Sequence, residues 1–202
     1  MAFIRKYDNV LFTVIFLVFA VVNFIFWGDL SLIRKLVTVF AVLAVLHNFE
    51  EKVWPGGFFV PLLGKLGLEQ KQPNFGNAML AVSGYWYVLL GAAYIFDKVP
   101  IIFILTIALS IFEALNHTAS IKMLDMKKPY TPGMITGYLL AALAIYSIVL
   151  MNRAGLTEWW HYLVGVLLWP ITFACMGFFI MRSYHVSLSE VLQNVKTNVL
   201  GK

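Results

Sequence analysis

The residues that could do chemistry begin with one histidine and two glutamates, in the run His47-Asn48-Phe49-Glu50-Glu51. They directly follow an unbroken apolar stretch, residues 39–46. Ionisable side chains cost about 2.5–3.5 kcal/mol each at the centre of a membrane helix, so they are rare there without a function. In a helix His47 and Glu51 share one face at i,i+4, and Glu50 flanks that face. This spacing predicts two metal ligands, His47 and Glu51, with Glu50 as a general base.

A second polar stripe lies in a later apolar segment. It consists of Thr106, Ser110, Glu113 and His117, which are spaced at helical intervals of four, three and four residues. Glu113 and His117 form another i,i+4 pair, and the two helices are expected to end on the same side of the membrane. We therefore predict His117 as a third metal ligand, and Glu113 as a fourth ligand or as a group that supports the ligands.

Two histidines and one carboxylate match a catalytic zinc site, which keeps a fourth position open for water. Soluble inverzincins use a related H-x-x-E-H helix, in which the histidines bind zinc and the glutamate acts as the base. The same ligand set also matches the facial triad of non-haem iron oxygenases. We predict a divalent metal cofactor, with zinc favoured over iron.

The composition is that of a membrane protein. Hydrophobic residues make up 61% of the 202 residues, charged residues only 12%, and the mean hydropathy is +0.83. A soluble domain typically carries about 25% charged residues. The net charge of +5 arises from basic residues in short loops between apolar segments, which indicates membrane topology rather than a nucleic-acid surface. We expect an integral protein of a bacterial cell membrane, with lipids around it and no nucleic-acid partner.

Six segments are long enough to cross a bilayer, which takes about 17–25 residues each. The predicted fold is all-α, a polytopic bundle of about six transmembrane helices over residues 10–27, 31–53, 77–96, 100–121, 133–152 and 158–181. Lys and Arg number eleven on the side that holds both termini and four on the other side, so both termini are predicted to be cytoplasmic. Residues 1–182 then form the transmembrane domain, and residues 183–202 form an amphipathic interfacial tail. The Gly-spaced apolar stretch 58–64 predicts a short interfacial or re-entrant piece.

Three separated elements make this chain resemble a family of membrane proteins that is named for an H-x-x-E-E motif. That family also carries a further histidine and a Y-x-P-G motif, which correspond here to His117 and to Tyr130-Thr131-Pro132-Gly133. The resemblance extends over most of the chain, and it implies that these residues form one site. It implies no particular reaction, because the family has no established activity.

The Y-x-P-G element precedes the fifth apolar segment on the cytoplasmic side. Pro132 suits a first helical turn and Thr131 suits its N-cap, while Tyr130 could position a substrate by donating a hydrogen bond to an oxyanion. The two remaining histidines are predicted to lie outside the site, His161 at the opposite interface and His185 at the surface.

These residues together predict a metal-dependent hydrolase in the cytoplasmic leaflet that acts on a lipid or another membrane-embedded substrate. Glu50 and Tyr130 are its predicted catalytic residues. Two alternatives use the same side chains. A non-haem iron lipid hydroxylase or desaturase would use the same ligands, and an ion- or proton-coupled transporter would use the carboxylates as cation sites.

Overall fold

The computed structural model describes residues 2–68 and 75–198, and its regular structure over these residues is helical throughout. This confirms the all-α prediction for the described part of the chain. Three short elements are η1 (Trp27–Asp29), α3 (Phe59–Lys65) and α8 (Leu188–Asn198). The long helices are α1 (Ala2–Ile25), α2 (Leu32–Lys52), α4 (Phe75–Ile95), α5 (Pro100–Met123), α6 (Met134–Arg153) and α7 (Trp159–Tyr184).

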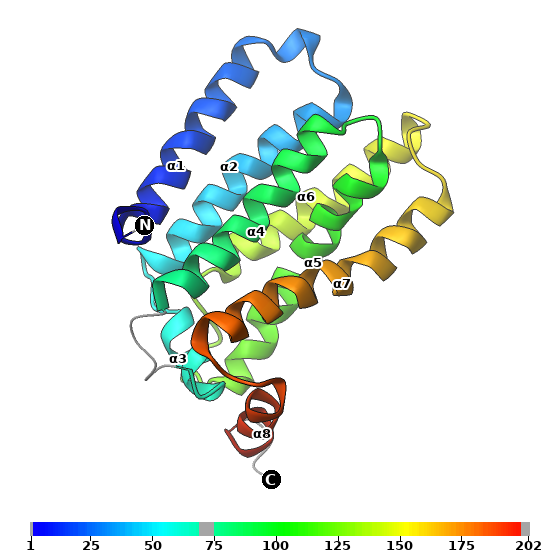
Figure 1. The fold of residues 1–202 in the computed structure, drawn as a ribbon. Helices are drawn as coiled ribbons and strands as arrows, with labels where there is room; N and C mark the ends of the chain where they lie inside the picture. Colours follow the sequence, from blue (N-terminus) through cyan, green and yellow to red (C-terminus); the bar gives the residue numbers. More distant parts are fainter. Residues whose placement is uncertain (1, 69–74, 199–202) are drawn as a thin grey trace.

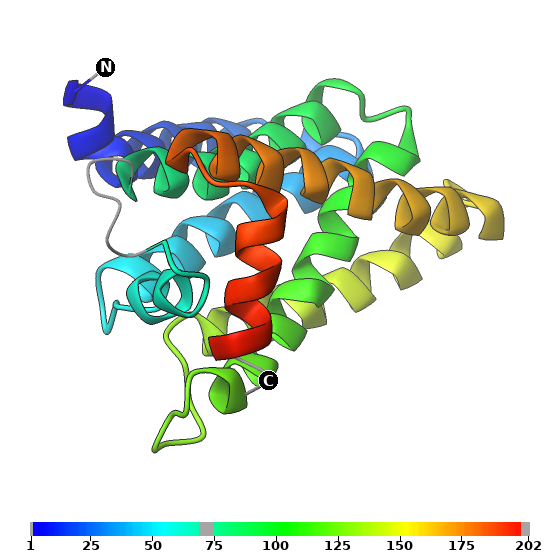
Figure 2. The ribbon, with the colours of Figure 1, turned by 60° about the horizontal axis from the view of Figure 1, so that its bottom comes forward.

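The long helices form a bundle in which neighbouring helices are joined at alternating ends (Figure 1). Helix α2 packs against α1, α4 and α6, and α5 packs against α4, α6 and α7. The short helices α3 and α8 lie next to each other at one end of the bundle (Figure 2). The side chain of Asn194 in α8 donates to the carbonyl oxygen of Leu66 at 3.0 Å, so the amphipathic tail is attached to the segment that follows α3.

Four helices, α2, α5, α6 and α7, are long and apolar enough to cross a membrane. The apolar stretches identified in α1 and α4 are shorter, Val10–Ile25 and Ala81–Ile95. Length and composition therefore support four of the six predicted spans, while the other two and the cytoplasmic termini stay predictions.

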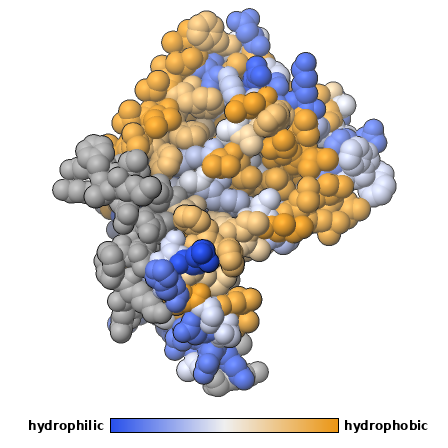
Figure 3. All heavy atoms as spheres, viewed as in Figure 1, coloured by the Kyte–Doolittle hydropathy of each residue, from blue (hydrophilic) through white to orange (hydrophobic). Residues whose placement is uncertain are grey.

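Apolar side chains cover much of the bundle surface (Figure 3), whereas hydrophilic residues gather around α8 and at the opposite end. The outer face of α7 is an example, because Leu163, Val166 and Ile171 are all exposed. Exposed apolar surface of this extent marks a region that contacts lipid or another apolar partner. This distribution is what a membrane-embedded bundle requires.

Polar contacts fix the end of α2 that lies far from the H-x-x-E-E motif. Ser31 caps the helix by accepting from the Arg34 N–H at 3.2 Å, and its hydroxyl donates to Asp97 Oδ2 at 2.6 Å. The same Asp97 oxygen lies 3.3 Å from Arg34 Nε. These contacts join the start of α2 to the segment that follows α4.

Candidate metal centre

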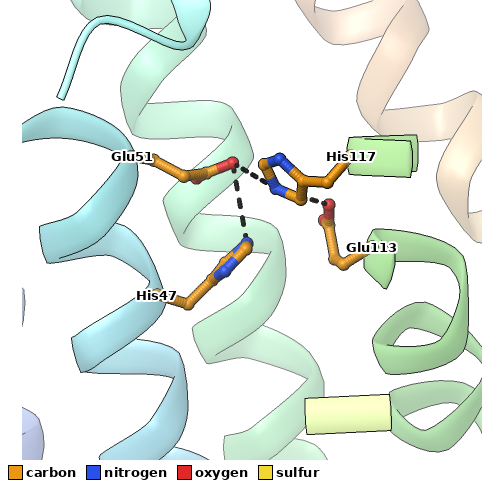
Figure 4. Close-up of side chains that lie close together, drawn as sticks. All are labelled: His47, Glu51, Glu113 and His117. Atoms are coloured by element: carbon orange, nitrogen blue, oxygen red, sulfur yellow. Dashed lines mark ion pairs between the residues drawn. The ribbon is translucent and has the colours of Figure 1, made fainter. Parts of the chain in front are cut away.

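Four ionisable side chains from α2 and α5 meet near the end of the bundle that carries α3 (Figure 4). They are His47, Glu51, Glu113 and His117, and one possible ligand atom from each lies within 4.8 Å of the others. All four are buried, with exposed fractions of 1%, 4%, 8% and 0%. The structure therefore brings together all four residues that the sequence predicts as metal ligands.

Glu51 faces both imidazoles, whose ring centroids lie 5.2 Å apart. Its Oε1 is 3.2 Å from Nε2 of His117 and 3.6 Å from Nε2 of His47. Glu113 Oε2 is 4.0 Å from the same His117 nitrogen. Ligand atoms at about 2.1 Å from a tetrahedral zinc ion are about 3.4 Å from one another, so these separations are compatible with a shared metal.

Thr131 orients the imidazole of His117. Nδ1 of His117 lies 3.1 Å from Thr131 Oγ1, and this hydroxyl donates to the main-chain carbonyl oxygen of His117 at 3.2 Å. Because the hydroxyl proton is used in that bond, Thr131 Oγ1 accepts a hydrogen bond from Nδ1–H. In a neutral imidazole the lone pair then lies on Nε2, the nitrogen beside Glu51.

Thr136, in the first turn of α6, orients His47 in the same way. Nδ1 of His47 lies 2.9 Å from Thr136 Oγ1, and this hydroxyl donates to Glu50 Oε2 at 2.5 Å. Thr136 Oγ1 is therefore the acceptor for Nδ1–H, and the lone pair of His47 also lies on Nε2. A hydrogen-bonded second ring nitrogen is the usual arrangement of histidines that ligate metals.

The two Nε2 atoms are buried and have no hydrogen-bond partner among the described residues. Both lie near the same oxygen of Glu51. A nitrogen lone pair and a carboxylate oxygen repel each other at this separation unless a proton or a cation lies between them. A divalent cation fits the site, because it would accept both lone pairs and balance the charges of Glu51 and Glu113. Two imidazole nitrogens with carboxylate oxygens suit zinc and also iron.

Glu50 lies beside this group of four, and the start of α6 holds its carboxylate. Oε1 accepts from the Tyr130 hydroxyl at 2.8 Å and from the Ile135 N–H at 3.3 Å. Oε2 accepts from the Thr136 N–H at 2.9 Å, in addition to the Thr136 hydroxyl. The free N–H groups of a first helical turn favour a negative charge. Glu50 thus connects α2 to α6 and, through Thr136, orients His47.

Tyr130 contributes to the same network as a donor. Burial, together with the hydrogen bond to the charged Glu50, raises the pKa of its phenol to about 12. The phenol is therefore protonated throughout the neutral range, and it donates a hydrogen bond to the Glu50 carboxylate. The predicted role of Tyr130 toward a substrate stays a prediction.

Gly133 explains the last position of the Y-x-P-G element. It is the N-cap of α6 with φ at +95°, a conformation that favours glycine. A Cβ atom there would lie 2.5 Å from His117 Cε1 and 2.6 Å from Glu51 Cγ. The prediction of Thr131 as the N-cap is wrong, because Gly133 takes that place and the Thr131 hydroxyl is bonded to His117.

The chain after α2 folds back over the cluster. The N–H of Phe58 donates to the carbonyl oxygen of Glu51 at 3.3 Å, and its ring centroid lies 4.4 Å from that of His117. The predicted short piece at 58–64 corresponds here to helix α3. Phe58 therefore shields the imidazole of His117 from water.

The other two histidines lie elsewhere. His161 stacks on Trp160 with a ring-centroid distance of 3.7 Å at the start of α7. His185 is exposed and caps the other end of that helix. Neither belongs to the group of four, in agreement with the sequence prediction.

A cavity of about 610 Å³ adjoins the cluster, and Glu51 and Glu113 are among the residues that line it. Its other walls come from α3, α4, α5, α7 and α8 and are mostly apolar. This volume lies within the range of about 300–1,000 Å³ that is common for ligand sites. The sequence did not predict the cavity, because residues from six separate helices form it.

Replacing Thr136 with valine should lower the metal affinity of the protein by about 10- to 100-fold, the usual effect of removing a partner of a ligand. Valine keeps the shape of the side chain but removes the hydroxyl that bonds both His47 and Glu50. Competition with a chromophoric chelator measures the affinity. Thr118→Val is the matched control, since the Thr118 hydroxyl bonds to Ala114 and Tyr138. Equal affinities in the two variants would contradict the orienting role of Thr136.

Comparison with known proteins supports the importance of the same region. A family model described as a protein of unknown function with HXXEE motif matches residues 38–149. The matched range includes the four clustered residues, the Y-x-P-G element and Thr136. The chain has no significant match among curated proteins or among solved structures.

Proposed function

Because the chain belongs to the family of proteins of unknown function with an HXXEE motif, we propose a function for that motif from its geometry. The protein is a metal-dependent hydrolase that acts on a lipid or another membrane-embedded substrate. One observation carries the proposal: two buried histidine nitrogens with free lone pairs lie beside a single carboxylate oxygen. The adjoining apolar cavity gives a substrate access to that group.

In the proposed topology α1 and α4 also cross the membrane, so that the bundle has six spans and both termini are cytoplasmic. The alternating direction of the long helices supports this arrangement. The excess of Lys and Arg on the side that holds the termini supports the orientation. The metal site then lies in the cytoplasmic leaflet, because Glu51 is next to the last residue of α2.

In the proposed reaction, His47, Glu51 and His117 would hold a divalent metal through Nε2, Oε1 and Nε2. A divalent metal at this position would supply a Lewis acid and lower the pKa of a water molecule. Thr131 and Thr136 keep the imidazoles in the tautomer that this role requires. Phe58 and the apolar cavity walls exclude bulk water from the group.

Glu113 is our choice for the residue that accepts the proton of the attacking water and returns it to the leaving group. Its carboxylate lies at the edge of the cluster and lines the cavity. The sequence pattern favours Glu50 for this role, but both Glu50 oxygens accept hydrogen bonds from α6. Two variants test this assignment. If Glu113 is the base, Glu113→Gln should keep the metal and lose turnover, whereas Glu50→Gln should weaken metal binding.

The experiment that tests this function begins with elemental analysis of the purified protein. We expect about one divalent metal per chain, and near-zero metal in the double variant His47→Ala/His117→Ala. The protein is then incubated with a total membrane lipid extract, and mass spectrometry follows the release of hydrolysis products. Turnover should stop after treatment with a chelator and return when the metal is restored.

Each result of this experiment has a clear consequence. The same near-zero metal content in the native protein and in the double variant would overturn the proposal. Bound iron with oxygen-dependent products would indicate a hydroxylase or desaturase that uses the same ligands. Proton flux in proteoliposomes that Glu51→Gln abolishes, without product release, would indicate a transporter.

A further inference from the structure

We propose that the cavity beside the cluster binds a long aliphatic chain, with the polar end of that molecule at Glu51 and Glu113. The binding of the chain is inferred from the cavity alone. Its assignment as the substrate of the site rests on the proposed function. The two inferences can therefore fail separately.

The walls of the cavity favour an apolar occupant. Helix α7 lines it from Phe173 to Met181, a length of about 12 Å along the helix axis. Leu188 and Val191 of α8 line it as well. A buried water molecule needs two to four polar partners, which apolar walls do not provide. An aliphatic chain matches these walls in polarity.

The charged groups of the lining indicate how the chain is oriented. Both carboxylates among the lining residues, Glu51 and Glu113, belong to the metal cluster. A carboxylate beside an aliphatic chain is unfavourable, whereas a carboxylate beside a polar headgroup can exchange a hydrogen bond. The polar end of the occupant therefore lies at the cluster, and its chain extends along α7 toward α8.

The position of α7 indicates where the chain comes from. Along the stretch of this helix that lines the cavity, Phe178 and the neighbouring Phe179 are exposed apolar residues. A chain can therefore pass from the bilayer into the cavity beside α7 without crossing water. The molecule that carries this chain is either a bilayer phospholipid or a free single-chain amphiphile. Both place the same aliphatic groups against the cavity walls.

The test is photolabelling of the protein in lipid nanodiscs with two probes. One probe is palmitic acid with a diazirine on its chain, and the other is a phosphatidylcholine that carries the same acyl chain. Gly177→Leu should place a side chain inside the cavity, because Gly177 lines it and a Cβ there meets no atom within 4 Å. Gly91→Leu is the matched control, since Gly91 is also open within 4 Å but lies in α4 outside the lining.

We expect label on the peptides that contain residues 58–68 and 173–181. The amount of label on these peptides should decrease about tenfold in Gly177→Leu and stay unchanged in Gly91→Leu. Label from palmitic acid alone identifies a single-chain amphiphile, and label from both probes identifies a bilayer lipid; either result supports the proposal. Label that is confined to the outer residues of α7, or that is equal in the two variants, overturns it. Metal content is measured in parallel, so cavity labelling without metal would contradict the proposed function while supporting chain binding.

Discussion

Replacing His117 with asparagine should lower the metal affinity of the protein by about 100- to 1,000-fold. Structural zinc sites with four ligands provide about 10–16 kcal/mol, or roughly 2.5–4 kcal/mol per ligand, and each 1.4 kcal/mol is a factor of ten. Asparagine can still place an amide near Thr131, where Nδ1 of His117 now lies at 3.1 Å. It has no atom at the position of Nε2, so the variant removes the ligand and keeps the neighbouring contact.

The chain provides a matched control for this experiment. His185→Asn makes the same substitution at an exposed histidine at the C-cap of α7, where the left-handed backbone also suits asparagine. The metal affinity of this control should equal that of the native protein. His47→Asn should behave like His117→Asn, because Nε2 of each imidazole lies near the same Glu51 oxygen. Native affinity in His117→Asn would show that the metal binds elsewhere or not at all.

The pairing of α2 with α5 is the part of the site that the sequence predicts best. His47 with Glu51 and Glu113 with His117 are i,i+4 pairs, so helical periodicity alone places each pair on one face. The topology then places both pairs near the same end of the bundle. The structure bears out this reasoning in the four-residue group, and in the burial of Thr106 and Ser110 along the same stripe of α5.

The contacts that orient these side chains cannot be predicted from periodicity. Thr131 belongs to the turn before α6, and Thr136 reaches His47 only because α6 packs against α2. The same packing brings the N–H groups at the N-terminus of α6 to Glu50. The carboxylate that the sequence predicts as a general base therefore accepts hydrogen bonds from this helix. Such roles depend on the distance between two helices, which local sequence patterns do not encode.

The Y-x-P-G element thereby acquires a physical role beside the H-x-x-E-E motif. Tyr130 donates a hydrogen bond to Glu50, and Thr131 is hydrogen-bonded to His117. Gly133 has no side chain, which leaves room for the His117 ring and the Glu51 side chain. The two motifs form a single structure, in which residues after α5 fix the ligands on α2 and α5. This arrangement predicts that a change in the turn should disturb the metal site as strongly as a change in a ligand.

Gly133→Ala should therefore destabilise the protein by about 2–5 kcal/mol and abolish high-affinity metal binding. The left-handed conformation costs alanine about 1–2 kcal/mol, and overpacking of a filled interior costs about 1–3 kcal/mol more. The added methyl group would lie 2.5 Å from His117 Cε1 and 2.7 Å from Nε2 of the same ring. Contacts this short force the His117 ring away from Glu51, so the ligands separate.

Gly155→Ala distinguishes the two contributions. Gly155 also has a positive φ, +66°, but a Cβ there meets no atom within 4 Å. This control should lose only the conformational part, about 1–2 kcal/mol, and keep native metal affinity. Thermal unfolding with and without added metal measures both effects, because a ligand that binds only the folded state raises its stability. Gly133→Ala should show no stabilisation by metal, and a gain equal to that of Gly155→Ala would mean that the turn does not support the site.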